Sequence, residues 1–156
     1  GEAGLDVMTG GYCGTMEAVS RGANEAGADV IGVACRQIED YRPVGPNRWV
    51  KTVVPTSTLS ERIEYLTIHA DAFIALPGGI GTLAEVAMVF NKMVISAILS
   101  KILILIGEGW KQTIQAFIDG QAENVNERTR TLPQFAKDPL EAVNLLIKSL
   151  QETQNG

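Results

Sequence analysis

The sequence predicts an α/β fold with three layers, in which an open, doubly wound parallel sheet of the Rossmann-like type lies between helices. The first observation is that short apolar runs alternate along the chain with segments whose apolar residues recur at helical spacing. The second is that the runs at residues 30–34, 73–76 and 102–106 are continuous. Such runs are typical of strands that are buried on both faces in a parallel sheet.

The elements follow in the order strand, helix, strand, strand, helix, strand, helix, strand, helix, with one more helix at the end. We expect the strands at residues 5–8, 30–34, 50–54, 73–76 and 102–106. We expect helices at residues 14–26, 60–69, 82–94 and 110–118. Asp138 and Pro139 supply an N-cap and a proline at the first helical position, so the last helix is predicted to begin there.

Two segments fit this alternation less well. Residues 36–47 contain two prolines, one glycine and mixed charges, which indicates a surface excursion at the carboxyl end of a strand, where open sheets bind ligands. Residues 123–131 are interpreted as a short edge strand. Nucleotide-binding sheets usually begin with a strand and a helix ahead of the first strand seen here. We therefore expect the first strand and helix of the sheet to be missing from this chain.

Length and composition predict one domain. A chain of 156 residues that is 46% hydrophobic can bury one core, so we expect a single α/β domain at residues 1–150 and a frayed tail at residues 151–156. The net charge is −5 and the basic residues are scattered, which argues against nucleic acid as a partner. Cys13 and Cys35 lack CxxC spacing and are predicted to be free thiols of a reducing compartment.

Membranes and metals are not expected partners either. The longest apolar runs fall far short of the roughly 20 residues that a membrane span needs, and no basic and then apolar leader opens the chain. A soluble, cytoplasmic protein is therefore expected. His69 is the only histidine, so it offers no metal cluster, and a structural role at its helix end is the favoured interpretation. Trp49 and Trp110 are interpreted as packing residues, with ligand stacking as the less favoured alternative.

The turn after the fourth predicted strand is rich in glycine. It reads Pro77, Gly78, Gly79, Ile80, Gly81 and Thr82, and it leads into the helix that carries Glu85. Glycine lets the backbone take positive φ and lets a phosphate come close to the N–H groups, which face the anion at the positive end of the helix dipole. We therefore predict a phosphate-binding site formed by Gly78, Gly79, Gly81 and Thr82.

A similar turn follows the first predicted strand. Its residues Gly10, Gly11, Gly14 and Thr15 repeat the order of paired glycines, then glycine and threonine, with Glu17 next. Two such turns in one sheet indicate one crevice, so these four residues are predicted to bind the ligand. The alternative is that the glycines only make tight turns between strand and helix and that the threonines cap the helices.

The segment from Glu61 and Arg62 to Glu85 resembles the signature of the LOG (Lonely Guy) family, once labelled "possible lysine decarboxylase". That signature is an arginine-bearing helix followed by PGGxGTxxE, which residues 77–85 match completely, and the likeness covers residues 5–107. Members release a cytokinin-type adenine base from its nucleoside 5′-monophosphate, and relatives in the wider superfamily bind or carry molybdenum cofactor. The resemblance implies that Arg62 is the catalytic arginine and Glu85 the catalytic glutamate.

The resemblance leaves two functions open. One is a phosphoribohydrolase, in which Glu85 stabilises the oxocarbenium-like state or activates water and Arg62 clamps the phosphate or ribose. The intact Arg62 and Glu85 favour this reading, with Glu17 or Asp71 as the acid for the leaving base. The other is a nucleotide or molybdenum cofactor carrier, which Ile63 favours because the family's hydrolases usually have lysine there. Arg62 and Glu85 are alternatively a structural ion pair.

Two further predictions concern cofactor and assembly. No cofactor is predicted, and lysine decarboxylation is rejected, because pyridoxal phosphate needs a Schiff-base lysine and none of the lysines here has a recognisable setting. The apolar helix at residues 83–94 carries few charges for a surface helix, so a partner subunit is expected to cover part of it. We expect a homodimer, for which C2 symmetry is the commonest solution.

Overall fold

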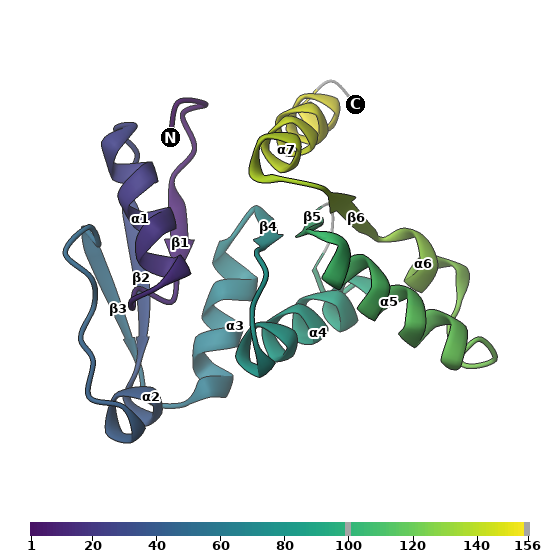
Figure 1. The fold of residues 1–156 in the computed structure, drawn as a ribbon, viewed down its shortest axis with the longest axis horizontal. Helices are drawn as coiled ribbons and strands as arrows, with labels where there is room; N and C mark the ends of the chain where they lie inside the picture. Colours follow the sequence, from purple (N-terminus) through teal and green to yellow (C-terminus); the bar gives the residue numbers. More distant parts are fainter. Residues whose placement is uncertain (99–100, 155–156) are drawn as a thin grey trace. The chain divides into compact units, whose positions relative to one another are not determined.

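The computed structural model describes residues 1–98 and 101–154, and the chain divides into two compact units, Gly1–Ala70 and Asp71–Gly156 (Figure 1). Each unit combines a three-stranded parallel sheet with helices. The predicted α/β class with parallel strands is therefore confirmed. The strands fall into two sheets, β1-β2-β3 in the first unit and β4-β5-β6 in the second.

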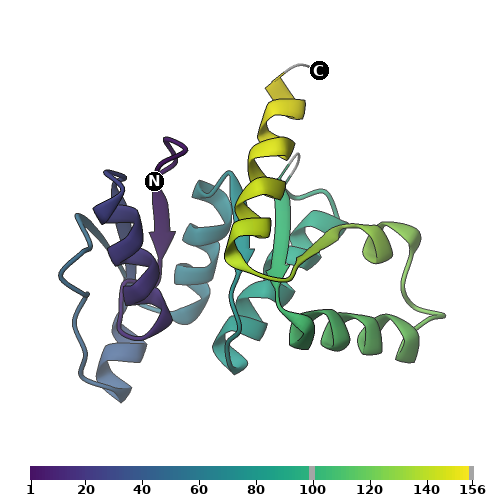
Figure 2. The same ribbon diagram turned by 45° about the horizontal axis from the view of Figure 1, so that its top comes forward.

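The first unit is built around its middle strand. The strands are β1 (Val7–Thr9), β2 (Val30–Cys35) and β3 (Thr52–Thr56), and the helices are α1 (Thr15–Glu25), α2 (Arg36–Tyr41) and α3 (Leu59–His69). Because β2 pairs with a strand on each side, its residues are the most buried of the sheet, with Val30 and Val33 fully covered. Helix α1 contacts β1 and β2, whereas α3 contacts β2 and β3 (Figure 2).

Helix α3 begins with a capping box. The Thr58 hydroxyl accepts a hydrogen bond from the Glu61 N–H, and the Glu61 carboxylate accepts one from the Thr58 N–H. This reciprocal pair satisfies N–H groups that a helix start leaves without partners. It fixes the first turn of α3, and Arg62 is the next residue along the chain.

The second unit has the same construction. Its strands are β4 (Ala72–Ala75), β5 (Ile102–Ile106) and β6 (Pro133–Ala136), and its helices are α4 (Ile80–Val94), α5 (Glu108–Gly120), α6 (Glu127–Thr131) and α7 (Pro139–Gln154). Strand β5 lies in the middle, and all of its residues are buried. Leu103 and Leu105 pack with Phe90 of α4 and Trp110 of α5 in one core cluster. Helix α7 contacts β5 and β6.

The start of α7 confirms the cap predicted at Asp138. A carboxylate oxygen of Asp138 accepts a hydrogen bond from the Glu141 N–H at 2.9 Å, and Pro139 is the first helical residue. The helix continues to Gln154, so it includes residues 151–154 of the segment expected to be a frayed tail. Residues 155 and 156 lie outside the described part of the chain.

The prediction of an edge strand at residues 123–131 was wrong. Residues 127–131 form helix α6, because the Asn126 side chain caps it by accepting from the Thr129 N–H at 2.8 Å. Strand β6 forms one edge of this sheet and begins at Pro133, a residue that cannot donate to a sheet ladder and is tolerated at an edge. Within residues 36–47, the chain first forms the short helix α2 and then a loop.

No helix in the described part of the chain is both long enough and apolar enough to cross a bilayer.

Candidate functional site

In the first unit, the side chain of Arg62 lies directly against the turn that follows β1. A Cβ placed on Gly10 would overlap the Arg62 guanidinium and would lie 2.7 Å from the Met16 sulfur. The structure therefore brings Arg62 of α3 against the predicted ligand-binding turn. Gly10 is needed here for the close approach of a side chain, since its φ does not lie in the left-handed region.

Arg62 is a buried cation. Only 7% of the residue is exposed, and its Nε donates a hydrogen bond to the Val33 carbonyl oxygen of β2 at 2.9 Å. A buried charge is tolerated when it is hydrogen-bonded, as the Arg62 guanidinium is. Arg62 is therefore oriented by the strand and helix, with its Nη2 beside Gly10.

Two other glycines of this turn have a backbone reason. Gly11 has φ 78° and Gly14 has φ 73°, backbone angles that residues with a side chain rarely adopt. A Cβ on Gly11 would also lie 3.0 Å from the Cα of Gly32, so the turn passes directly over β2. Gly14 then serves as the N-cap of α1, where no side chain caps the helix. Thr15, which was predicted to bind the ligand, is the first residue of α1.

Tyr12 anchors the same turn to the end of β2. The residue is 3% exposed, and its hydroxyl oxygen accepts from the Cys35 N–H at 2.7 Å. The hydroxyl proton has two acceptors within reach, Glu39 Oε1 at 3.1 Å and the Cys35 carbonyl oxygen at 3.2 Å. Burial, with the nearby Glu39, raises the pKa of Tyr12, although the hydrogen bond from Cys35 works the other way.

Asn47 holds the turn from the other side. Its N–H donates to the Gly11 carbonyl oxygen at 2.7 Å, and its side-chain Nδ2 donates to the carbonyl oxygens of Gly11 and Tyr12, both at 2.9 Å. Sequence reasoning named neither Tyr12 nor Asn47 as a functional residue. The only signal was the place of Asn47 in the excursion at residues 36–47, which was expected near a ligand.

In the second unit, the turn between β4 and α4 contains the other predicted residues. The Thr82 side chain lies directly over Gly78, so that a Cβ on Gly78 would overlap the Thr82 hydroxyl. The glycines of this turn do not have positive φ, so the backbone freedom expected for them is not their reason for being glycine. A Cβ on Gly79 or on Gly81 would meet no atom within 4 Å.

The N-terminus of α4 begins at this turn. Gly79 is its N-cap, and no side chain forms a cap hydrogen bond there. Glu85 is half-buried and lies four residues after Gly81, which places the two on the same face of the helix. Trp110 supports the turn from α5, because its Nε1 donates to the Leu76 carbonyl oxygen at 3.0 Å. This contact confirms the packing role expected for Trp110.

Arg62 belongs to the first unit and Glu85 to the second. The structure brings Arg62 together with Gly10, and Glu85 together with the turn that contains Gly81 and Thr82. The ion pair between Arg62 and Glu85 that the sequence left open stays a prediction.

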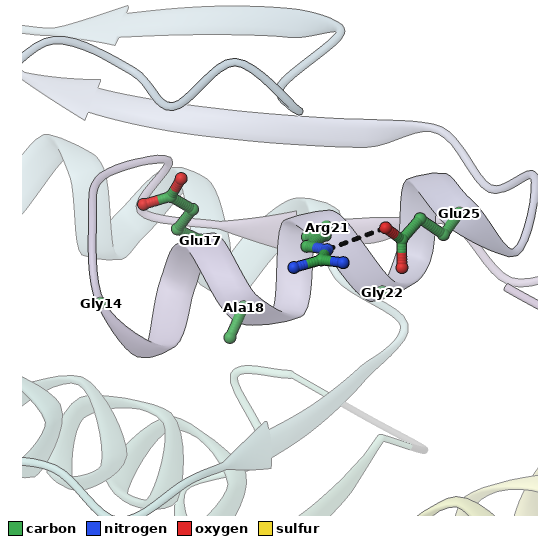
Figure 3. A pocket seen from close by; sticks show the side chains of 6 residues that line it. All are labelled: Gly14, Glu17, Ala18, Arg21, Gly22 and Glu25. Atoms are coloured by element: carbon green, nitrogen blue, oxygen red, sulfur yellow. Dashed lines mark hydrogen bonds and ion pairs between the residues drawn. The ribbon is translucent and has the colours of Figure 1, made fainter.

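Two shallow hollows on the first unit bear on the site. One, of about 520 Å³, follows the outer face of α1, where Arg21 and Glu25 form an ion pair at 2.8 Å (Figure 3). Of the predicted site residues it touches Gly14 and the candidate acid Glu17, but neither Gly10 nor Arg62, so we do not assign the site to it. The other, of about 590 Å³, lies at the carboxyl ends of β2 and β3 and is lined by Ala34, Cys35, Arg36, Glu39, Asp40, Pro55, Thr56 and Ser57.

The remaining candidates have structural partners. The His69 ring stacks on Tyr65 at 3.9 Å between centroids, and its Nδ1 lies 2.9 Å from the Tyr65 carbonyl oxygen, which confirms a role at the helix end. The Trp49 ring lies under the Arg48 guanidinium at 4.5 Å. Cys13 and Cys35 are free thiols. Among the described residues, no group of three His, Cys, Asp or Glu side chains is placed to hold a metal ion.

Comparison with protein families and curated proteins gives a consistent result. A family model described as "Possible lysine decarboxylase" matches residues 16–146. A probable cytokinin riboside 5′-monophosphate phosphoribohydrolase of Oryza sativa subsp. japonica is 33% identical over 121 residues, which are 77% of this chain and 56% of the relative. A cytokinin riboside 5′-monophosphate phosphoribohydrolase of Arabidopsis thaliana is 39% identical over 79 residues, 51% of this chain and 34% of the relative. The chain spans about half the length of the curated relatives it matches or less.

Comparison with solved structures agrees on the fold. The molybdenum cofactor binding protein from Rippkaea orientalis superposes with a TM-score of 0.71 at 25% identity, over 95% of this chain and 78% of that one. The molybdenum cofactor carrier protein from Chlamydomonas reinhardtii gives a TM-score of 0.70 at 24% identity, over 96% and 80%. The second likeness concerns the fold alone.

Proposed function

The chain belongs to the LOG family, whose family model is described as "Possible lysine decarboxylase", and from this we propose that it binds a nucleoside 5′-monophosphate and hydrolyses its N-glycosidic bond. Relatives that share about a third of their aligned residues with it are named for that reaction on cytokinin riboside 5′-monophosphates. The proposal extends the reaction class to this chain and leaves the base open.

The observation that carries the proposal is the open space at Gly79 and Gly81. Neither glycine has positive φ, and a Cβ on either would meet nothing within 4 Å. Packing inside the unit therefore gives no reason for glycine at these positions. A phosphate bound against the first N–H groups of α4 supplies one, because a Cβ would keep its oxygens from the backbone.

Glu85 is the proposed group for the chemistry at the sugar. It lies about one helical turn beyond Gly81 along the axis of α4, and in a nucleotide the ribose is the group attached to the phosphate. The carboxylate takes a proton from water as the water oxygen bonds to C1′. The bond between C1′ and the base nitrogen breaks, and the base leaves with the electron pair and takes up a proton from solvent, to which Glu85 returns the proton it took from the attacking water. The products are the free base and ribose 5-phosphate.

Arg62 is the proposed clamp for the phosphate or ribose. Its Nε is committed to the Val33 carbonyl oxygen, which fixes the plane of the guanidinium. A charge already oriented in the protein loses little entropy when it binds an anion, and it stabilises the anion more strongly because it is shielded from water.

A carrier for a nucleotide or for molybdenum cofactor is the second candidate. One structural neighbour, at 25% identity, is described as a molybdenum cofactor binding protein. Ile63 also stands where the resemblance predicts lysine. A carrier uses the same turns to hold the phosphate and does not break the glycosidic bond.

Base release from a panel of nucleoside 5′-monophosphates tests the proposal. Free base is followed by chromatography for the wild type, for Glu85→Gln and for the matched control Glu108→Gln. Glu108 is an exposed glutamate in the first turn of α5, so the control makes the same chemical change in the same unit. We expect release by the wild type and the control, and a fall of about 10² to 10⁴ in rate for Glu85→Gln.

The other outcomes separate the two candidates. Saturable nucleotide binding without release favours the carrier. Release that persists unchanged in Glu85→Gln removes Glu85 from the mechanism.

The proposal includes a homodimer that acts in the cytoplasm. Helix α4 leaves several apolar side chains exposed, among them Ile80 at 82% and Met88 at 41%. An apolar face of this kind on a single helix is typical of a protein interface. C2 symmetry would cover the same face on both copies.

A further inference from the structure

The strongest unexplained contacts of the first unit are those of Asn47. Its loop lies between α2 and β3, yet its backbone and side chain together make three hydrogen bonds to the turn at residues 11 and 12. The bonds have donor–acceptor distances of 2.7, 2.9 and 2.9 Å, within the range of well-formed hydrogen bonds. They join residues that are 35 and 36 positions apart.

These contacts determine which way the turn presents its N–H groups. Both acceptors are carbonyl oxygens, those of Gly11 and Tyr12. In a trans peptide the C=O and the N–H of the next residue point in opposite directions, and the described chain has no cis peptide bond. The N–H groups of Tyr12 and Cys13 therefore point away from Asn47. Within the described residues, no hydrogen bond occupies either of these two N–H groups.

Positive φ angles complete the arrangement. Gly11 at φ 78° begins these two peptide units and Gly14 at φ 73° follows Cys13, and successive N–H groups in such turns form concave anion sites. Without a fixed partner for the carbonyls, glycine would let the same peptides rotate. The Arg62 guanidinium lies against the neighbouring Gly10.

We propose that Asn47 is a positioning residue, which turns the N–H groups of Tyr12 and Cys13 toward an anionic group bound at this turn by binding the carbonyl oxygens behind them. The proposal rests on the proposed function for the identity of the anion. The inference about the orientation of the turn does not depend on that function, because it uses only the contacts of Asn47.

Asn47→Asp tests the proposal. The change keeps the shape of the side chain but replaces the Nδ2 donor by a charged oxygen that repels the two carbonyls. Asn124→Asp is the matched control, because Asn124 is an exposed asparagine in the turn after α5. If Asn47→Asp fails to fold by circular dichroism, Asn47→Ala takes its place, since it removes the donor without adding a charge.

The first readout needs no ligand. Amide ¹⁵N relaxation of residues 10–14 reports how rigidly the turn is held. We expect lower order parameters at Tyr12 and Cys13 in Asn47→Asp and wild-type values in Asn124→Asp. Unchanged order parameters in the Asn47 variant overturn the proposal, whatever the protein binds.

The second readout uses AMP and inorganic phosphate as probes. We expect the Kd of each to rise about tenfold in Asn47→Asp, as expected for a site whose hydrogen-bond donors are no longer held in place. The amide resonances of Tyr12 and Cys13 should shift on titration in the wild type. Equal Kd values for wild type and variant, with binding intact, overturn the role toward phosphate. If the wild type binds neither probe, the proposed function fails, and the relaxation readout alone decides the positioning role.

Discussion

The Arg62 guanidinium occupies the space that a side chain at position 10 would fill, so Arg62 can lie here only because residue 10 is glycine. One residue follows β1 and the other lies on α3. The arginine is held in this position by its bond to the Val33 carbonyl oxygen. The first glycine turn and the proposed phosphate clamp are thus coupled within the first unit.

Gly10→Ala should lower both stability and activity. The added methyl group must displace Arg62 or Met16 in a buried region, and such overpacking costs about 1–3 kcal/mol. Urea denaturation measures the loss of unfolding free energy, and base release measures the loss of activity. Gly22→Ala is the control, because a Cβ there meets nothing within 4 Å and replaces glycine inside α1. It should gain up to about 1 kcal/mol. Equal stabilities of the two variants would contradict the coupling.

Gly81→Ala should separate stability from binding. The new Cβ has open space in the first turn of α4, so the unfolding free energy should stay constant or rise by up to about 1 kcal/mol. AMP affinity, measured by calorimetry, should fall. The matched control is Gly109→Ala, at the second position of α5 and also in open space. A Gly81→Ala protein that binds AMP like the wild type would remove the phosphate from this turn.

Tyr12→Phe should change how stability depends on alkaline pH. Burial raises the folded-state pKa of Tyr12 above its usual value of 10.0. The folded state therefore holds the proton more tightly, and this contribution to stability is present below pH 10 and is lost as pH rises from about 10 through the folded-state pKa.

Urea midpoints measured from pH 8 to pH 11 check this prediction. The wild-type midpoint should fall more steeply above pH 10 than that of Tyr12→Phe. At pH 8 the variant should be less stable by about 1–3 kcal/mol, because the buried Cys35 N–H loses its acceptor. Parallel pH curves would show that Tyr12 does not titrate as a buried group.

Met88→Glu should dissociate the proposed homodimer. Met88 lies on the exposed apolar face of α4, and a charge buried in an interface without a partner opposes association. Sedimentation velocity at several protein concentrations measures the change. Phe117→Glu on α5 is the control, since Phe117 is also an exposed apolar helix residue. If the wild type sediments as a monomer, or both variants behave alike, α4 is not the interface.

The elements with strong local signals were predictable from the sequence. Strand β5 was placed at Ile102–Ile106 because five consecutive apolar residues are typical of a strand that is buried on both faces of a parallel sheet. The start of α7 was placed by the cap at Asp138. Strand β6 was missed because Pro133–Ala136 is short, begins with proline and shows no alternation.

The candidate site was predictable only where its residues form a motif. Gly10, Gly11 and Gly14 stood out as a turn, but the contact between Gly10 and Arg62 joins two elements and leaves no local pattern. The same holds for Asn47, whose partners lie 35 and 36 residues away. Side-chain contacts over such distances depend on the folded arrangement of the strands, which spacing alone does not encode.

An NMR titration of the second glycine turn tests the central claim most directly. Glu85→Gln protein, labelled with ¹⁵N to follow the amides of residues 79–82, is titrated with AMP, inorganic phosphate and adenosine, so that turnover does not interfere. The account predicts that AMP and phosphate shift these amide resonances downfield through hydrogen bonds to the anion, whereas adenosine leaves them unchanged. Equal shifts with adenosine, or no shifts at residues 79–82 while AMP binds elsewhere, would contradict a phosphate site at the start of α4.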